Sequence, residues 1–320
     1  MDKHYDKVAR AIKKSKRIAL CIHQFPDGDA IGSMIALALV LKRLKKKFFL
    51  FCPSELPRRY EFLPFYGQIK RSPSRTDVFD LAIAIDCASR AQLAGLYAEI
   101  FKNTPLTIEI DHHIFREVFS DIALVEKNAA AVGELIYLLC GSLKVKIDKD
   151  IAVALMVSII VETGSFRLPS VTSETFRICS ELISCGVNYY KLVENCYWSR
   201  TRAEAMLLGF SFSNLKFMKG GSLAVTEITF SDLRRLGARQ EDVDPIADQI
   251  RTLKNVRAVL LFREMSGRRW RVSLRSKGVL NVGKIAEEFG GGGHPDIAGC
   301  YLKKNNFEKE RLIKRVLAAL

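Results

Sequence analysis

Short apolar runs alternate with helical patterns through the first half of the chain. Continuous apolar stretches at residues 17–23, 48–52, 79–86 and 105–111 predict four buried strands. Helical patterns lie between or after them, at residues 30–44, 132–140, 149–161, 173–184 and 189–197. Because strands without polar alternation are buried on both faces, this order predicts an α/β domain with a parallel sheet and helices on both sides.

The pattern changes after residue 186. Residues 188–210 predict helices that connect to a second domain. Strands at 215–218 and 222–229, and at 256–264 and 269–275, flank glycine-containing turns and predict two hairpins. A helix is predicted at 281–289, directly before a run of four glycines. We therefore expect a first domain at 1–187, a helical linker at 188–211 and a smaller α+β domain at 212–320.

Composition agrees with two globular domains and suggests the kind of partner. A chain of 320 residues corresponds to about two domains, and 48% hydrophobic with 27% charged residues excludes collagen and disordered chains. The 50 basic residues outnumber the 35 acidic ones, which gives a formal net charge of +15. Such an excess favours a polyanionic partner without identifying it.

The sequence predicts a cytoplasmic protein without a membrane partner. Its longest uncharged apolar stretch, residues 151–161, is shorter than the ~20 residues of a membrane span. The charged N-terminus lacks the apolar core of a signal peptide. The eight cysteines form no C-x-x-C pair and mostly lie in apolar runs, which favours reduced core thiols over disulfides or a zinc site.

Acidic and imidazole side chains follow three of the predicted strands. His23, Asp27 and Asp29 come after the first strand, Asp86 ends the third, and the sequence Asp111-His112-His113 ends the fourth. Carboxyl ends of parallel strands meet at one edge of the sheet, which is the usual ligand site of such folds. We expect these side chains to converge there.

Several carboxylates close together repel one another and need a cation to remain ionised. Mixed Asp and His ligands suit manganese or a similar divalent ion better than calcium. Taken alone, Asp27-Gly28-Asp29 reads as a turn that caps the next helix, and His112-His113 as two surface histidines. Together, at strand ends, they favour a metal site; a carboxylate shared between two ions about 3.5–4 Å apart is typical of phosphoryl hydrolysis.

Five segments resemble the motifs of the DHH phosphoesterases, in the family's order. They are the sequences HQFPDGDAIGS from residue 23, IAIDCAS around Asp86, Asp111-His112-His113, VETGSFR from residue 161 and GGGGHPDIAG from residue 290. The segment RVSLRS from residue 271 resembles the substrate-binding strand of the DHH-associated C-terminal domain. The resemblance covers residues 17–302 and is nearest to the stand-alone oligoribonucleases and pAp phosphatases.

This resemblance implies a Rossmann-like catalytic domain, a smaller substrate-binding domain and an active site in the cleft between them. It assigns catalytic roles to His113, Asp111 and Asp86, with Asp111 orienting His112. It also implies two divalent ions, with manganese expected and magnesium or cobalt as alternatives, and Asp86 as the bridging ligand. The implied metal ligands are His23, Asp27, Asp29, Asp86, His112 and Glu162.

Position 162 departs from the family, which usually has Asp there. Glutamate keeps the charge but places its oxygens about one bond further from the backbone. We expect Glu162 to ligate directly; the alternative is a weakened second metal site, or a chain that only binds nucleotides or RNA.

Basic residues and glycines of the second domain are candidates for holding the substrate. Arginine side chains match phosphate oxygens, and glycines allow backbone N–H groups to approach them closely. The alternatives are a solvated basic edge strand for residues 269–275 and a flexible loop for 290–293. The predicted substrate-binding residues are Arg167, Arg275, Ser276, Gly291, Gly292, Gly293 and His294.

Together these features predict a metal-dependent phosphodiesterase acting on RNA or DNA oligonucleotides of about two to five nucleotides. Its products would be 5′-nucleotides. Two related activities remain alternatives, removal of the 3′-phosphate from 3′-phosphoadenosine 5′-phosphate (pAp) and hydrolysis of cyclic dinucleotides. A homodimer is a further hypothesis that the sequence does not test.

Overall fold

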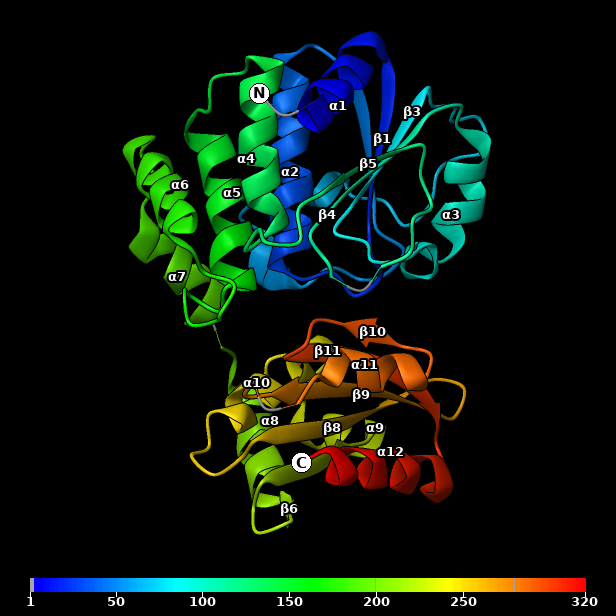
Figure 1. Ribbon diagram of the computed structural model, residues 1–320, viewed down its shortest axis with the longest axis vertical. Coiled ribbons are helices and arrows are strands. Elements are labelled where there is room, and N and C mark those ends of the chain that lie inside the picture. Colours follow the sequence, from blue (N-terminus) through cyan, green and yellow to red (C-terminus); the bar gives the residue numbers. More distant parts are fainter. Residues whose placement is uncertain (1–2, 115, 199, 279) are drawn as a thin grey trace. The chain divides into compact units, whose positions relative to one another are not determined.

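The computed structural model describes residues 3–320 apart from residues 115, 199 and 279. The chain divides into two compact units, residues 1–199 and residues 200–320 (Figure 1). The predicted linker at 188–211 contains helix α7 (Tyr189–Tyr197) of the first unit and most of helix α8 (Arg202–Ser213) of the second. Each unit has its own sheet and its own hydrophobic core.

The first unit is built on a parallel sheet of five strands in the order β2-β1-β3-β4-β5. The four predicted strands are confirmed within two residues at their ends. The fifth was missed because it has only four residues and half of them are partly exposed. The strands are β1 (Arg17–Ile22), β2 (Lys47–Phe51), β3 (Leu81–Ile85), β4 (Thr107–Asp111) and β5 (Ile122–Val125).

Helices cover both faces of this sheet, as the apolar strand pattern predicts. On one face lie α1, α2, α4 and α5, and on the other lies the short helix α3 (Figure 1). The sequence interpretation missed α1 and α3. Their bounds are α1 (Lys3–Lys14), α2 (Gly28–Arg43), α3 (Gly95–Glu99), α4 (Val132–Leu143), α5 (Lys149–Glu162) and α6 (Ser173–Ser184).

Strand β1 shows why both faces are buried. Its residues Ile18, Leu20 and Ile22 belong to the large core under the long helices, whereas Ala19 and Cys21 belong to the smaller core that includes α3. Successive side chains of a strand point to opposite faces, so a strand in the middle of such a sheet has to be apolar throughout. Apart from Glu109 inside β4, the acidic side chains of the sheet therefore lie at or after the strand ends.

The second unit contains a mixed sheet of six strands in the order β10-β11-β9-β8-β7-β6, in which only β7 and β8 run parallel. Both predicted hairpins, β6–β7 and β8–β9, are confirmed. The strands are β6 (Lys216–Met218), β7 (Leu223–Ile228), β8 (Ala258–Met265), β9 (Arg269–Ser276), β10 (Gly292–Gly293) and β11 (Ile297–Lys303).

Alternation along β8 builds two cores, one on each face. Leu260 and Phe262 pack with helices α11 and α12, and Val259 and Leu261 pack with α8, α9 and α10. Strand β9 lies between β11 and β8, which rules out the alternative of an exposed basic edge strand for this segment. The remaining helices are α9 (Phe230–Leu236), α10 (Ile246–Arg251), α11 (Val282–Glu288) and α12 (Asn306–Ala319).

All eight cysteines are free thiols, and seven of them are buried, in agreement with the core-thiol interpretation. Within the described residues, we find no helix whose length and apolar character would let it cross a membrane.

Two neighbouring glycines should respond differently to alanine. A Cβ at Gly291 would lie 2.1 Å from the carbonyl oxygen of Gly299, whereas a Cβ at Gly292 would meet nothing within 4 Å. We expect Gly291→Ala to lower the free energy of unfolding of the second unit by about 1–3 kcal/mol, because overpacking shifts the backbone. Urea unfolding measures the change. Gly292→Ala is the matched control, and equal losses in the two variants would contradict this packing argument.

Candidate metal centre

Three adjacent strand ends deliver the predicted acidic and imidazole side chains to one place. His23 follows β1, Asp86 follows β3, and Asp111 to His113 end or follow β4. Strands β1, β3 and β4 are neighbours in the sheet, and the strand order reverses between β1 and β3. This is the topological switch point, where parallel α/β sheets bind their ligands.

A first group of metal-ligand type consists of His23, Asp27 and Asp86, whose ligand atoms all lie within 4.8 Å of one another. The Nε2 of His23 is 3.6 Å from the Oδ2 of Asp86. Its Nδ1 lies 2.9 Å from the carbonyl oxygen of Gln24, so this nitrogen carries a proton, and in the neutral ring Nε2 has the lone pair.

Asp27 also caps helix α2. Its Oδ1 accepts the backbone N–H groups of Asp29 and Ala30 at 2.9 and 3.0 Å. The helix-capping alternative for this turn is therefore confirmed, and it is compatible with membership of the first group. A cap of this kind fixes the carboxylate at the helix N-terminus, where the helix dipole favours negative charge.

A second group consists of Asp29, Asp86 and His112. The Nε2 of His112 lies 3.6 Å from Asp29 Oδ2 and 3.8 Å from Asp86 Oδ1. The same Nε2 lies 3.8 Å from the Oε1 of Glu162, at the last residue of α5. The glutamate side chain thus reaches the ring of His112 in spite of its extra methylene.

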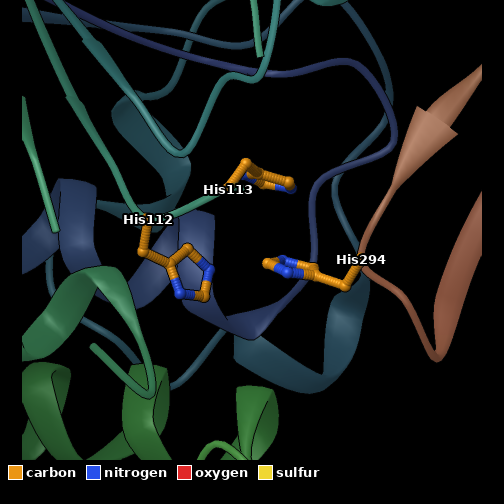
Figure 2. A group of neighbouring side chains, drawn as sticks. All are labelled: His112, His113 and His294. Atoms are coloured by element: carbon orange, nitrogen blue, oxygen red, sulfur yellow. The ribbon is translucent and has the colours of Figure 1, made fainter. Parts of the chain in front are cut away.

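His113 belongs to a third group, with Asp86 and Asp111. Figure 2 shows His112 and His113 following β4, with ring centroids 5.3 Å apart. The Nδ1 of His113 lies 2.7 Å from Asp111 Oδ1, whereas the Nδ1 of His112 lies 3.1 Å from the carbonyl oxygen of Ala129. This corrects the expectation that Asp111 orients His112: Asp111 orients His113, and the chain at residue 129 orients His112.

Asp86 is common to all three groups. Its backbone has a positive φ of 59°, which few residues other than glycine adopt, and its N–H donates to the carbonyl oxygen of Ile110 at 2.9 Å. Its Oδ1 is buried and has no hydrogen-bond partner among the described residues. A buried carboxylate oxygen without a donor is costly unless a cation or a ligand contacts it.

The pKa values of Asp29 and Asp86 are shifted in opposite directions. Burial raises the pKa of Asp29 well above its usual value, and the charges of Asp86 and Asp27 raise it further. For Asp86, burial also raises the pKa, but the hydrogen bond from His23 and the charge of His113 outweigh it and leave the pKa lowered.

His113 and Asp111 form a charged pair. Burial alone would lower the pKa of His113, but the charge of Asp111 and the hydrogen bond to it raise this pKa to about 9. In turn, His113 holds the pKa of Asp111 well below its usual range against the effect of burial. The pair places a positive imidazolium beside the carboxylate cluster.

The donor set fits divalent metal ions. Carboxylate oxygens and neutral imidazole nitrogens are the ligands that manganese and similar ions accept, and the groups share one carboxylate with an unpaired oxygen. Four of the predicted ligands come from loops after β1 and β3 or from the start of α2, His112 follows β4, and Glu162 comes from the end of α5. The sheet edge therefore assembles all six predicted ligands.

The sequence analysis did not predict that Arg116 holds Asp111 in place. Arg116 donates from Nε to Asp111 Oδ2 at 3.2 Å, and its Nη2 lies 2.5 Å from the Oε1 of Glu109 on β4. Both carboxylates are buried. Glu109 was the available signal, because an acidic residue inside an otherwise apolar strand requires a cationic partner.

In the second unit, the predicted substrate residues lie at the end of β9 and on the neighbouring strands. Arg275 on β9 donates to both carboxylate oxygens of Asp248, at 2.9 and 3.3 Å. Arg263 and Arg271 lie 2.9 and 3.4 Å from the Oδ1 of Asp244. Asp244, just before α10, and Asp248, within it, thus balance the charges of these arginines on β8 and β9.

The glycine run is part of the sheet. Gly292 and Gly293 form β10 and pair with Gly299 and Ala298 of β11. Gly293 has a φ of 139°, and a Cβ there would lie 2.5 Å from the carbonyl oxygen of Ile297. The alternative of a flexible loop is wrong for these two residues, because both pair with β11. At Gly293 the positive φ and the close approach of β11 also require glycine.

Ser276, His294 and Arg167 are each held by local contacts. Ser276 is buried, and its hydroxyl accepts the N–H of Leu280 at 3.2 Å. The backbone N–H of His294 donates to Ile297 at 2.6 Å. Arg167 lies in the loop after α5 and donates from Nε to the carbonyl oxygen of Gly164. The first two lie near Arg275, because Ile297 pairs with Arg275 across β11 and β9.

Removing Arg116 should destabilise the first unit strongly. Arg116→Ala leaves the buried carboxylates of Glu109 and Asp111 without their cation, and we expect a loss of about 3–5 kcal/mol in the free energy of unfolding. Urea unfolding checks this. Arg90→Ala is the control, because its ion pair with Glu117 is exposed and should be worth about 0–1 kcal/mol. A loss for Arg116→Ala no larger than for Arg90→Ala would show that the buried network is not needed.

Comparisons with known proteins agree with this architecture. The family model described as "DHH family, N-terminal domain" matches residues 17–159, and the model described as "DHHA1 domain" matches residues 220–320. The bifunctional oligoribonuclease and PAP phosphatase NrnA of Thermus thermophilus is 30% identical over 304 residues, which cover 95% of this chain and 89% of that protein.

A protein of the same name from Bacillus subtilis is 25% identical over 91% of each chain. Among solved structures, an exopolyphosphatase-related protein from Bacteroides fragilis has the same fold, with a TM-score of 0.88 and 23% identity over 99% of this chain and 98% of that one. The two matched domains coincide with the two sheets, and together they cover most of the chain. The protein therefore belongs to the DHH family and carries a C-terminal DHHA1 domain.

Proposed function

We propose that this protein is a two-metal phosphodiesterase that hydrolyses RNA or DNA oligonucleotides of about two to five nucleotides to 5′-nucleotides. One observation carries the proposal: Asp86 belongs to all three groups of metal-ligand type that form at the strand ends. Its buried Oδ1 has no hydrogen-bond donor among the described residues. The names of the relatives from Thermus thermophilus and Bacillus subtilis support the substrate class. Their second named activity supports hydrolysis of pAp as an additional reaction.

The roles of the ligands follow from the two groups around Asp86. His23, Asp27 and Asp86 would hold one ion, and Asp29, Asp86, His112 and Glu162 the other. We expect manganese, with magnesium and cobalt as alternatives. When bound, such ions polarise a phosphoryl oxygen and lower the pKa of a coordinated water. The carbonyl oxygens near His23 and His112 keep each imidazole in the tautomer that leaves Nε2 available.

His113 has a different role in this proposal. Its Nδ1 is engaged by Asp111, so only Nε2 is available to donate to an oxygen of the scissile phosphate. A charged donor fixed in place before the reaction stabilises the negative charge that develops on the phosphoryl group. Asp111 and Arg116 keep the ring in position.

The second unit would bind the terminal phosphate of the substrate. Arg275, Ser276 and the segment from Gly291 to His294 lie on adjacent strands, and backbone N–H groups at glycines allow close approach of phosphate oxygens. The ion pair with Asp248 holds the guanidinium of Arg275 in a fixed orientation. Arg167 would contribute from the loop after α5.

A manganese-dependent assay tests the function directly. We expect release of AMP from pApA and of GMP from pGpG, phosphate release from pAp, and loss of all three when EDTA removes the metal. Asp86→Ala should reduce turnover to background, because both ions lose a ligand. Asp150→Ala, an exposed acid at the start of α5, is the control and should retain activity. Undiminished hydrolysis by Asp86→Ala would refute the metal assignment, and cleavage of cyclic dinucleotides alone would refute the substrate class.

Two substitutions test whether Glu162 binds metal: one removes its charge, and the other keeps the charge on a shorter side chain. If its carboxylate ligates, Glu162→Gln should weaken manganese binding about ten- to a hundredfold, whereas Glu162→Asp should retain it. Isothermal titration calorimetry on metal-free protein measures both. Equal binding by the wild type and Glu162→Gln would indicate that position 162 lies outside the coordination sphere.

A further inference from the structure

Ser158 lies where three helices of the first unit meet. It is on α5, fully buried, and faces the N-terminus of α4 and the first turns of α2. Two glycines allow this close approach. A Cβ at Gly32 on α2 would lie 2.6 Å from the carbonyl oxygen of Ala154, and a Cβ at Gly133 on α4 would lie 2.2 Å from the Oγ of Ser158.

The hydrogen bonds of Ser158 fix the direction of its proton. The N–H of Gly133 donates to its Oγ at 2.9 Å, and this Oγ donates to the Oδ1 of Asp29 at 2.5 Å. The hydroxyl of Ser33 lies 3.1 Å from the same Oδ1. Since a hydroxyl has a single proton and Gly133 occupies one of its lone pairs, Ser158 is held as a donor to the carboxylate.

The other oxygen of Asp29 is held by the same helix terminus. Its Oδ2 accepts the N–H of Val132 at 2.9 Å, and it lies 3.6 Å from the Nε2 of His112. Helix α4 has twelve residues, and its N-terminal N–H groups favour an ionised carboxylate. Both oxygens of Asp29 are therefore fixed before any ligand arrives.

We propose that Ser158 is a positioning residue, which together with the N-terminus of α4 orients Asp29 for metal binding. This inference rests on the proposed two-metal function. Ser158 is not among the proposed metal ligands, and it acts through its hydrogen bond to the Oδ1 of Asp29. Partners of this kind fix the orientation of a ligand, and losing them weakens metal affinity.

Manganese binding to the purified full-length chain tests the proposal without substrate. For Ser158→Ala, we expect the dissociation constant of one of the two bound ions to rise about ten- to a hundredfold, with the other unchanged. Titration calorimetry and electron paramagnetic resonance on EDTA-treated protein measure both sites. Ser211→Ala is the matched control, because Ser211 is an equally buried helical serine whose hydroxyl donates to the carbonyl oxygen of Leu207 in its own helix.

A swap of two residues provides a rescue that a merely structural role would not allow. A Cβ at position 133 would lie 2.2 Å from the Oγ of Ser158. The double variant Ser158→Gly/Gly133→Ser therefore moves the hydroxyl from α5 to α4 and relieves the clash. We expect Ser158→Gly and Gly133→Ser each to weaken manganese binding, and the double variant to bind more tightly than either.

The outcomes separate this inference from the proposed function. Manganese affinities of Ser158→Ala and Ser211→Ala that both equal the wild type would overturn it. A lower unfolding temperature of Ser158→Ala in EDTA, with no change in manganese affinity, would also overturn it and leave Ser158 a packing residue. Failure of the wild type to cleave pApA while it binds manganese would refute the proposed function and leave the positioning role intact.

Discussion

The structure of the first unit depends on a buried carboxylate that the protein itself leaves incompletely paired. Asp86 sits at the end of a central strand, within 3.6–3.8 Å of nitrogens of His23, His112 and His113, and one of its oxygens lacks a donor among the described residues. Concentrating acids in this way costs folding free energy through burial and repulsion. Cations reduce this cost, which makes the cluster a candidate metal centre.

The surrounding structure limits how the ligands can move. Backbone N–H groups at the start of α2 fix Asp27, which caps that helix. The N-terminus of α4 and two serines fix Asp29, and Arg116 fixes Asp111. Some of these partners are close in sequence, such as Ser33 and Arg116, whereas Ser158 and the N-terminus of α4 lie more than a hundred residues from Asp29. Preorganisation of this kind matters for catalysis, because donors and ligands that are already in place need no reorganisation during the reaction.

The excess of basic residues has a different meaning from the one that composition suggests. The acids that gather at the metal centre are a small part of the total charge, and the arginines of β8 and β9 are largely balanced by Asp244 and Asp248. Fixed arginines of this kind bind phosphate through geometry more than through net charge. The remaining excess is spread over the surface, where it would attract anions at long range.

The sequence by itself determined the α/β class of the first unit, the two hairpins of the second and the set of chemical groups at the strand ends. It could do so because apolar runs and strand-end positions are local properties, and parallel strands bring their ends to one edge. The short strand β5 and the helices α1 and α3 were not predicted, because their hydrophobic patterns are short or mostly polar. Only the tertiary structure decided which partner each group has: Asp111 with His113, Arg116 with Glu109, Asp248 with Arg275, and Ser158 with Asp29, 129 residues apart. Hydrogen bonds and ion pairs act over a few ångströms, and sequence spacing does not show which distant side chains come that close.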